Sequence, residues 1–305
     1  MSWAEADIPD QSGRTAVVTG ANGGLGLETA RALAAAGAEV VMAARNQERA
    51  AAARDQIQAS VPEAKLTIVE LDLGSLDSVE VAAEQVLAAH QTIDLLVNNA
   101  GVMGIPEQRT ADGFEMQLGV DHLGHFAFTA RLLPALLRAQ AARIVTVTSS
   151  AHHMGRAVNP ENPHLDGRYG PWRAYNQAKL ANFHFGLGLH KLLSEAGAPG
   201  ASLVAHPGLS NTELQAVSVK ETGGGLSQRF FLALARNVGM PPADGALSQL
   251  RAATDPKARS GEFYGPLFVT NGPPVRKPVL RPGNKRAIKK LWQVSERETG
   301  LELRA

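Results

Sequence analysis

The feature that most constrains the fold is an alternation of short apolar segments with longer helix-forming ones. The first short segment, Thr15–Thr19, is rich in β-branched residues, and a glycine-rich turn joins it to an Ala/Leu-rich helical segment at 25–36. Further strands are expected at 39–44, 66–71, 93–97, 143–148, 201–205 and 262–264, and further helices at 47–59, 75–89, 112–138, 172–195 and 244–253. Continuous apolar strands that alternate with helices are typical of a parallel sheet covered on both faces. The sequence therefore predicts an α/β fold: a Rossmann-type doubly wound sheet of about seven mostly parallel strands with helices on both faces.

The domain organisation follows from the length of 305 residues and the absence of a linker or internal repeat. This length allows two domains or one large one. We expect a single domain over 1–305, with its core at about 14–265. Three segments fit the alternation poorly, namely 151–172, 209–240 and the C-terminal tail 274–305. The first two follow strands at the edge where open α/β sheets bind ligands, so they are predicted to be substrate-side insertions.

Composition excludes several classes of protein. The 30 basic and 29 acidic residues nearly cancel, which argues against a nucleic-acid partner. The chain has no cysteine, so disulfides, thiolate metal sites and cysteine nucleophiles are excluded. No run of about 18 apolar residues predicts a membrane span, and the acidic N-terminus does not resemble a signal peptide, so a cytoplasmic protein is expected. No metal is expected either, because the adjacent His152 and His153 lack a carboxylate at ligand spacing; a loop or pocket-lining role is favoured.

The glycine turn predicts a dinucleotide site. It reads Thr19-Gly-Ala-Asn22-Gly-Gly24-Leu25-Gly26 and lies between the first strand and the first helix. Gly20 permits the tight turn, Gly24 lets a phosphate approach the backbone, and Gly26 allows close packing of helix on sheet. The helix N-terminus then offers unpaired N–H groups to a pyrophosphate.

The end of the second strand indicates which coenzyme is bound. A site that reads the ribose of NAD(H) carries an acidic residue there, but this strand ends in Ala44 and is followed by Arg45 and, one turn later, Arg49. A guanidinium can bind the 2′-phosphate of NADP(H) through two hydrogen bonds. We therefore expect NADP(H), while NAD(H) stays open because Arg45 could simply cap a solvated strand end.

A larger set of motifs resembles the short-chain dehydrogenase/reductase family over about residues 14–265. In chain order the set is the glycine turn, Asp72-Leu73, Asn98-Asn-Ala100-Gly101, Ser149, Tyr175-x-x-x-Lys179 and Pro207-Gly208. His122-Leu-Gly-His125-Phe, Ser149 with 151–153, and Lys179-Leu-Ala-Asn182 resemble the retinol-dehydrogenase-like branch. The stretch 291–300 is similar to uncharacterised actinobacterial members, and a soluble member without an N-terminal anchor is expected.

The resemblance implies roles for these residues. Asp72 and Leu73 are expected at the adenine edge, Asn98 and Ala100 on the adenosine side, Gly101 where the coenzyme needs room, and Pro207, Gly208 and Thr212 at the nicotinamide end. Ser149 is expected to orient the substrate, although Thr148 and Ser150 leave this register open by one residue. Tyr175 is expected to be the general acid/base, with Lys179 as its partner.

The chemistry of the pair explains why these residue types are needed. A free tyrosine hydroxyl has a pKa near ~10, and a nearby ammonium lowers that value because it favours the phenolate. Residues i and i+4 lie on one helix face, so Tyr175 and Lys179 point into the same cleft. The serine hydroxyl can bind the substrate oxygen, where charge develops as the hydride moves.

Asp121 departs from the family pattern, which usually has asparagine there to hold a water in a relay to the lysine. A carboxylate favours a charged Lys179 and disfavours a Tyr175 phenolate. We expect a retained relay with a shifted acid limb of the pH profile, and the alternative is a degenerate, weakly active member.

Together these residues predict an NADP(H)-dependent oxidoreductase that interconverts an alcohol and a carbonyl on a hydrophobic small molecule. The hydrophobic substrate is suggested by the apolar segment 230–234, which could be a lid but could equally pack in the core or at an interface. Trp172 either borders the pocket or packs at a helix start. The alternative function is an NADP-binding regulator or scaffold with little turnover. A homodimer or homotetramer is the habit of the family.

Overall fold

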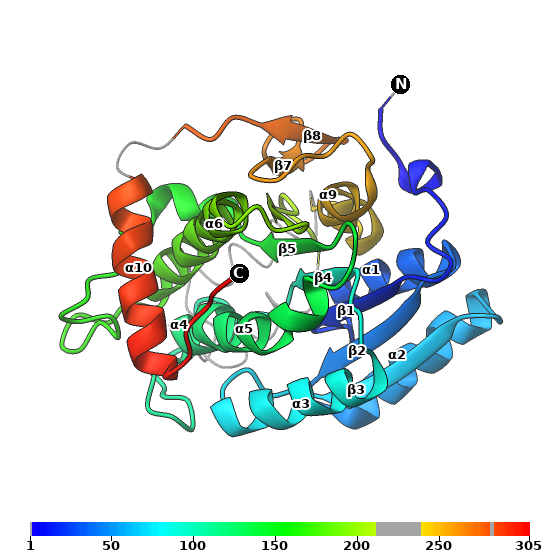
Figure 1. Ribbon diagram of the computed structural model, residues 1–305. Coiled ribbons are helices and arrows are strands. Elements are labelled where there is room, and N and C mark those ends of the chain that lie inside the picture. Colours follow the sequence, from blue (N-terminus) through cyan, green and yellow to red (C-terminus); the bar gives the residue numbers. More distant parts are fainter. Residues whose placement is uncertain (1, 212–238, 281–283) are drawn as a thin grey trace.

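The computed structural model describes residues 2–211, 239–280 and 284–305, and eight strands in this part of the chain form one sheet (Figure 1). The strands lie in the order β3-β2-β1-β4-β5-β6-β7-β8. Their bounds are β1 Thr15–Thr19, β2 Glu39–Ala44, β3 Lys65–Glu70, β4 Leu95–Asn98, β5 Arg143–Val147, β6 Ala201–Ala205, β7 Phe263–Pro266 and β8 Pro274–Lys277. Neighbouring strands are parallel except β7 and β8, which are antiparallel. The order reverses between β1 and β4, which is where a doubly wound sheet binds its ligand.

The helices cover both faces of the sheet, as the apolar strands require. One face packs against α1 Gly24–Ala35, α2 Gln47–Ser60 and α9 Pro242–Thr254. The other packs against α3 Leu76–Ala89, α5 Gly124–Leu136, α6 Pro171–Glu195 and α10 Asn284–Thr299. Shorter elements are η1 Glu5–Asp7, α4 Met116–Leu118, η2 Gly119–Leu123 and η3 Ser150–Met154. The expected fold class is thereby confirmed.

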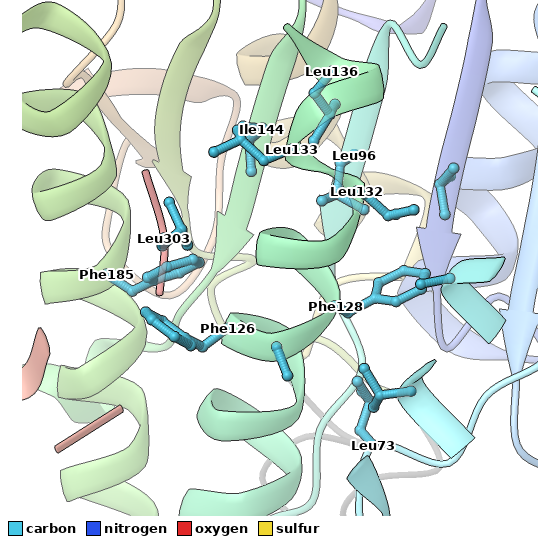
Figure 2. Packing of buried hydrophobic residues seen from close by; sticks show 14 of the residues in the cluster. Leu73, Leu96, Phe126, Phe128, Leu132, Leu133, Leu136, Ile144, Phe185 and Leu303 are labelled. Carbon is cyan, nitrogen blue, oxygen red and sulfur yellow. The ribbon is translucent and has the colours of Figure 1, made fainter. Parts of the chain in front are cut away.

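The larger hydrophobic core lies between the sheet and α5, α6 and α10. Figure 2 shows Phe126 of α5 facing Phe185 of α6, with Leu303 from the C-terminal segment beside Phe185. The ring centroids of Phe126 and Phe185 are 5.8 Å apart, and Trp292 of α10 stacks on Phe185 at 5.7 Å. This aromatic cluster fixes α5, which continues from the turn η2 that contains Asp121, against α6, which carries Tyr175 and Lys179.

Two expectations about local structure were wrong. The predicted helix 112–138 begins only at Met116 and passes through the π-helical turn η2 before α5 continues to Leu136, two residues after Pro134. The apolar pattern did not show this turn. A π-helical turn holds one extra residue, and the segments before and after it each keep the ordinary helical spacing of apolar residues. The tail 274–305 is also more regular than expected, since it contributes β8 and α10.

The tail is tied to α6 and η2 by specific contacts. Figure 1 shows α10 beside α6, where a Cβ atom on Gly188 would lie 2.3 Å from the Trp292 ring. Ser295 of α10 lies 2.8 Å from His122 of η2, and its hydroxyl donates to the Leu291 carbonyl. His122 therefore donates through Nε2 to Ser295. Helix α10 thus holds the π-helical turn from outside.

Candidate active site

The glycine turn forms the approach to α1 and has the geometry of a phosphate cradle. Gly20 has φ +68°, and a Cβ on Gly26 would lie only 2.2 Å from the Gly20 carbonyl oxygen, so this position can hold only glycine. Gly24 has φ +54° and begins α1, whose N-cap residue Gly23 provides no capping side chain. The first N–H groups of the helix are therefore free of a side-chain cap and suited to a pyrophosphate. Asn22 and Leu25 lie in the same turn and are partly exposed.

Basic side chains flank this turn. Arg45, directly after β2, has 71% of its side chain exposed, and its Nη1 lies 3.9 Å from Asp72 Oδ2 at the end of β3. Arg49 reaches over the turn, since its Nη2 lies 3.6 Å from where a Cβ of Gly23 would be. Asp72 is held in place by the Gly74 amide, which donates to its Oδ1 at 2.8 Å. The groups that would read the adenosine half thus come from the ends of two adjacent strands.

Of the residues at the end of β4, some lie beside the glycine turn and others face the core. Asn98 is fully buried, and its amide donates to Thr129 of α5 at 3.0 Å. The side chain of Asn98 therefore faces α5, and its expected place on the adenosine side stays a prediction. Ala100 is partly buried beside Gly20. The side chain of Leu73 likewise packs in the core, as Figure 2 shows.

Ser149, Tyr175 and Lys179 meet where β5 ends and α6 begins. The Ser149 side chain interacts with the Tyr175 phenol and lowers its pKa, and Lys179 Nζ lies 5.6 Å from the centre of the Tyr175 ring. Helix α6 is attached to β5 by Thr148, whose hydroxyl donates to the Lys179 carbonyl at 2.6 Å, and by the Asn182 amide, which donates to the Val147 carbonyl. The expected convergence of the three side chains is therefore seen in the structure.

The structure also distinguishes between the three hydroxyls at this strand end. Thr148 is buried and its hydroxyl is used by the Lys179 carbonyl, while Ser150 is exposed on the outside of η3. Of the three side chains, that of Ser149 interacts with the Tyr175 phenol. This placement favours Ser149, whose role in orienting the substrate stays a prediction.

Asp121 lies against Lys179 in the buried interior. Its Oδ2 is 2.9 Å from Lys179 Nζ, and its Oδ1 accepts the Val102 N–H at 2.7 Å. Gly101 lies against this pair, and a Cβ there would lie 3.0 Å from both Asp121 Oδ1 and Lys179 Nζ. The carboxylate therefore contacts the ammonium directly. The space above the pair is kept free by the missing side chain of Gly101.

Burial and the neighbouring charges shift the pKa values of Tyr175 and Lys179 in opposing directions. Burial raises the pKa of Tyr175, and this effect exceeds the lowering by the Lys179 ammonium and by the Ser149 hydrogen bond; Asp121 raises it further. Burial alone would lower the pKa of Lys179, but the charges of Asp121 and Tyr175 and the hydrogen bond to Asp121 together outweigh burial, and the pKa is raised. Lys179 is therefore held as an ammonium beside the phenol, and Asp121 weakens its effect on Tyr175.

His125 links the glycine turn to Asp121 and was given no role by the sequence argument. Its Nδ1 donates to the Asp121 carbonyl at 2.9 Å, so its Nε2 accepts from the Thr19 hydroxyl at 2.8 Å. The Thr19 oxygen in turn accepts the N–H groups of Asn99 and Ala100. Burial lowers the pKa of His125 to about 4, which keeps the ring neutral in this network. The i, i+4 spacing of Asp121 and His125 is the feature of the sequence that could have indicated this contact.

The loop after β6 closes the site on the side of β7. Gly208 has φ +71°, and a Cβ there would lie 2.5 Å from the Thr270 carbonyl oxygen, so the Pro207-Gly208 turn packs against the β7–β8 hairpin. Thr212 and the apolar segment 230–234 lie outside the described residues. Trp172 borders Tyr175, with ring centroids 6.1 Å apart in an edge-to-face arrangement.

The two adjacent histidines belong to η3, where His152 is buried and His153 is exposed. His152 donates through Nδ1 to the Ser149 carbonyl at 2.6 Å and stacks on Phe183 at 4.5 Å. Across residues 2–211, 239–280 and 284–305, no cluster of three His, Cys, Asp or Glu side chains is placed to bind a metal ion. In that same part of the chain, no helix combines the length and apolar character needed to cross a bilayer.

Comparison with known proteins connects this geometry to a family. A family model described as "short chain dehydrogenase" matches residues 14–161. The chain is 34% identical to a polyprenol dehydrogenase of Danio rerio over 99% of this chain and 91% of that protein. It is 42% identical to retinol dehydrogenase 11 of Mus musculus over 66% of this chain, a match that spans 63% of the mouse protein. A crystal structure of an uncharacterized protein from Mycobacterium Paratuberculosis is 38% identical over the whole of both chains, with a TM-score of 0.80.

Proposed function

The chain belongs to the short-chain dehydrogenase/reductase family, in its retinol-dehydrogenase-like branch, and we propose that it uses NADP(H) to interconvert an alcohol and a carbonyl on a hydrophobic small molecule. The observation that carries this proposal is the contact of Ser149, Tyr175 and Lys179 next to an uncapped, glycine-lined helix N-terminus. The continuous sheet supports treating 1–305 as one domain.

The residues present fit a nicotinamide dinucleotide. The pyrophosphate would bind at the N–H groups of α1, with Gly20, Gly24 and Gly26 leaving the room it needs. Arg45 and Arg49 would bind a 2′-phosphate, and Asp72 and Ala100 would border the adenosine. Gly101, Lys179, Pro207 and Gly208 would surround the nicotinamide riboside. When bound, the coenzyme supplies or accepts the hydride.

The chain's own residues would handle the proton and the substrate oxygen. Ser149 would donate its hydroxyl hydrogen to the substrate oxygen, and Tyr175 would take the alcohol proton in oxidation or give a proton in reduction. Lys179 would hold its positive charge beside the phenol and favour the phenolate. Asp121 would fix the position of that ammonium.

The proposed class of substrate rests on the relatives. Two similar proteins are named for polyprenol and retinol, which are long apolar alcohols. Trp172 beside Tyr175 supplies an apolar ring at the border of the site. We infer that the substrate places an apolar chain against this ring.

The test is nicotinamide absorbance with a panel of aldehydes, ketones and long-chain alcohols. Tyr175→Phe should lower turnover by about 10²–10⁴-fold, because general acid/base catalysis is lost, while NADPH binding is retained. Tyr264→Phe is a matched control, since the hydroxyl of this β7 residue donates to Glu262 away from the site. Full activity of Tyr175→Phe would overturn the mechanism. Tight NADPH binding by a wild type that turns over no panel member would favour the non-catalytic regulator.

Coenzyme choice is tested separately by calorimetry. Arg45→Ala should weaken NADPH binding about tenfold or more and leave NADH binding nearly unchanged, because only NADPH carries the 2′-phosphate. Arg54→Ala on the outer face of α2 is the control. Equal effects of Arg45→Ala on both coenzymes would refute the assignment.

A further inference from the structure

A cavity lies at the amino ends of the central strands, opposite the cluster of Ser149, Tyr175 and Lys179. It has a volume of about 500 Å³ and is formed at the amino ends of β1, β4 and β5. The carboxyl ends of the same three strands lead into Gly20, Asn98 and Ser149. Because the strands are parallel, the cavity and the catalytic cluster lie at opposite ends of them. A ligand in one site would not block the other.

Three guanidinium groups line this cavity against one carboxylate: Arg14, Arg138 and Arg143, with Asp94. Asp94 is already engaged, since its Oδ2 accepts the Thr15 N–H at 2.9 Å and its Oδ1 lies 3.7 Å from Arg14 Nε. The lining therefore has two positive charges more than it has negative ones. Charge of this sign in a concave site attracts anions.

Two of the arginines keep donors available toward the cavity. Arg143 is half-buried and uses Nη1 to donate to the Ala252 and Asp255 carbonyls at the end of α9. Arg138 uses Nη1 to donate to the Gln91 carbonyl. Within the described part of the chain, neither Nη2 atom has a protein acceptor. Each side chain is thus anchored through one nitrogen and can offer another to a ligand.

Arg143 lies in a positive electrostatic environment. Burial lowers the pKa of Arg143, and the positive charge of Arg14 lowers it further, by more than Asp255 raises it. An anion between the two guanidinium groups would remove this repulsion. The oxygens of the anion would accept hydrogen bonds from the Nη2 donors of Arg138 and Arg143 in place of water.

From this geometry we propose that the cavity is a binding site for a small phosphate-bearing ligand, of the size and charge of a diphosphate group. Planar guanidinium forks match the oxygens of phosphate and bind them through paired hydrogen bonds. The volume is within the range of small-molecule sites, roughly 300–1,000 Å³. A multivalent anion satisfies the two uncompensated charges, which a single carboxylate does not. This site goes beyond the proposed oxidoreductase activity and does not depend on it.

The probe is inorganic pyrophosphate, titrated calorimetrically into the full chain with NADPH at a saturating concentration. NADPH occupies the glycine turn, which could otherwise bind pyrophosphate as well. We expect one site, and a rise in Tm of about 3 °C at ten times its dissociation constant compared with chloride at equal ionic strength. Malonate as a dicarboxylate comparator should bind more weakly.

Variants separate this cavity from the rest of the surface. Arg138→Gln and Arg143→Gln should each raise the pyrophosphate dissociation constant about tenfold or more, and turnover by Arg138→Gln should stay unchanged. Arg54→Gln removes the same charge from α2 and should leave binding as it is. Because Arg143 also supports α9, the exposed Arg138 keeps the test valid if Arg143→Gln does not fold. No binding beyond chloride, or equal binding by wild type and Arg138→Gln, would overturn the proposal.

Discussion

Replacing Asp121 by asparagine keeps the shape of the buried pair and removes one charge from it. Asp121 Oδ2 lies 2.9 Å from Lys179 Nζ, which lies 5.6 Å from the Tyr175 ring centre, so the carboxylate is within about 8.5 Å of the ring, the sum of the two distances. At an effective dielectric constant of about 20, two unit charges at that separation interact by about 2 kcal/mol. This corresponds to about 1.4 pKa units.

The sign of the effect follows from the roles proposed for the two residues. Asp121 raises the pKa of Tyr175, so its removal lowers that pKa and makes the phenolate available at lower pH. In the oxidation direction the rate rises with pH as Tyr175 loses its proton. The acid limb of kcat/KM should therefore move to lower pH by about 1 to 1.5 units in Asp121→Asn.

The assay is the pH dependence of kcat/KM for alcohol oxidation, followed by coenzyme absorbance for both proteins. Asp77→Asn, an exposed change on α3, is the control and should leave the profile unchanged. Urea unfolding of Asp121→Asn should show a loss of about 1–3 kcal/mol, because the Lys179 ammonium keeps a hydrogen-bond acceptor but loses the opposite charge. Coincident profiles for wild type and Asp121→Asn, or a shift to higher pH, would refute the reasoning.

Two further predictions concern the turn and a buried histidine. Gly26→Ala should weaken NADPH binding at least about tenfold in calorimetry, because its Cβ would lie 2.2 Å from the Gly20 carbonyl oxygen, whereas Gly200→Ala, whose Cβ would come no closer than 3.6 Å to its neighbours, should bind normally. Burial lowers the pKa of His122 to about 3, so below pH ~6.5 only the unfolded chain takes up this proton and stability falls as pH falls. His122→Gln should reduce the loss of unfolding free energy between pH 7 and pH 5 by about 2 kcal/mol in total, and an unchanged loss in urea titrations would contradict this.

Much of the site could be predicted because parallel strands bring their carboxyl ends to one edge. The glycine turn, Asp72 and Ser149 each follow a strand, and the i, i+4 spacing of Tyr175 and Lys179 requires one helix face. These are local patterns, and topology alone then brings them together.

The parts that could not be predicted depend on contacts between distant segments. Asn98 was expected at the coenzyme, but its burial against Thr129 depends on where α5 crosses the strand end. Thr148 is distinguished from Ser149 by a tertiary contact, because its hydroxyl donates to the Lys179 carbonyl. The sequence does not show that contact. Strand β8 has only four residues and begins with proline, so its pairing with β7 left little trace in the sequence.

The position of α10 has a consequence for the order in which the molecule can form. His122 and Ser295 are separated by 173 residues, and Leu303 completes the core around Phe185. Contacts over such sequence distances form late, because the intervening chain must first be ordered. During synthesis, the π-helical turn with Asp121 has no outer support until residues 284–303 have been made. A chain that stopped before α10 would contain Ser149, Tyr175 and Lys179. It would lack the contacts with α10 that support η2 and complete the core around Phe185.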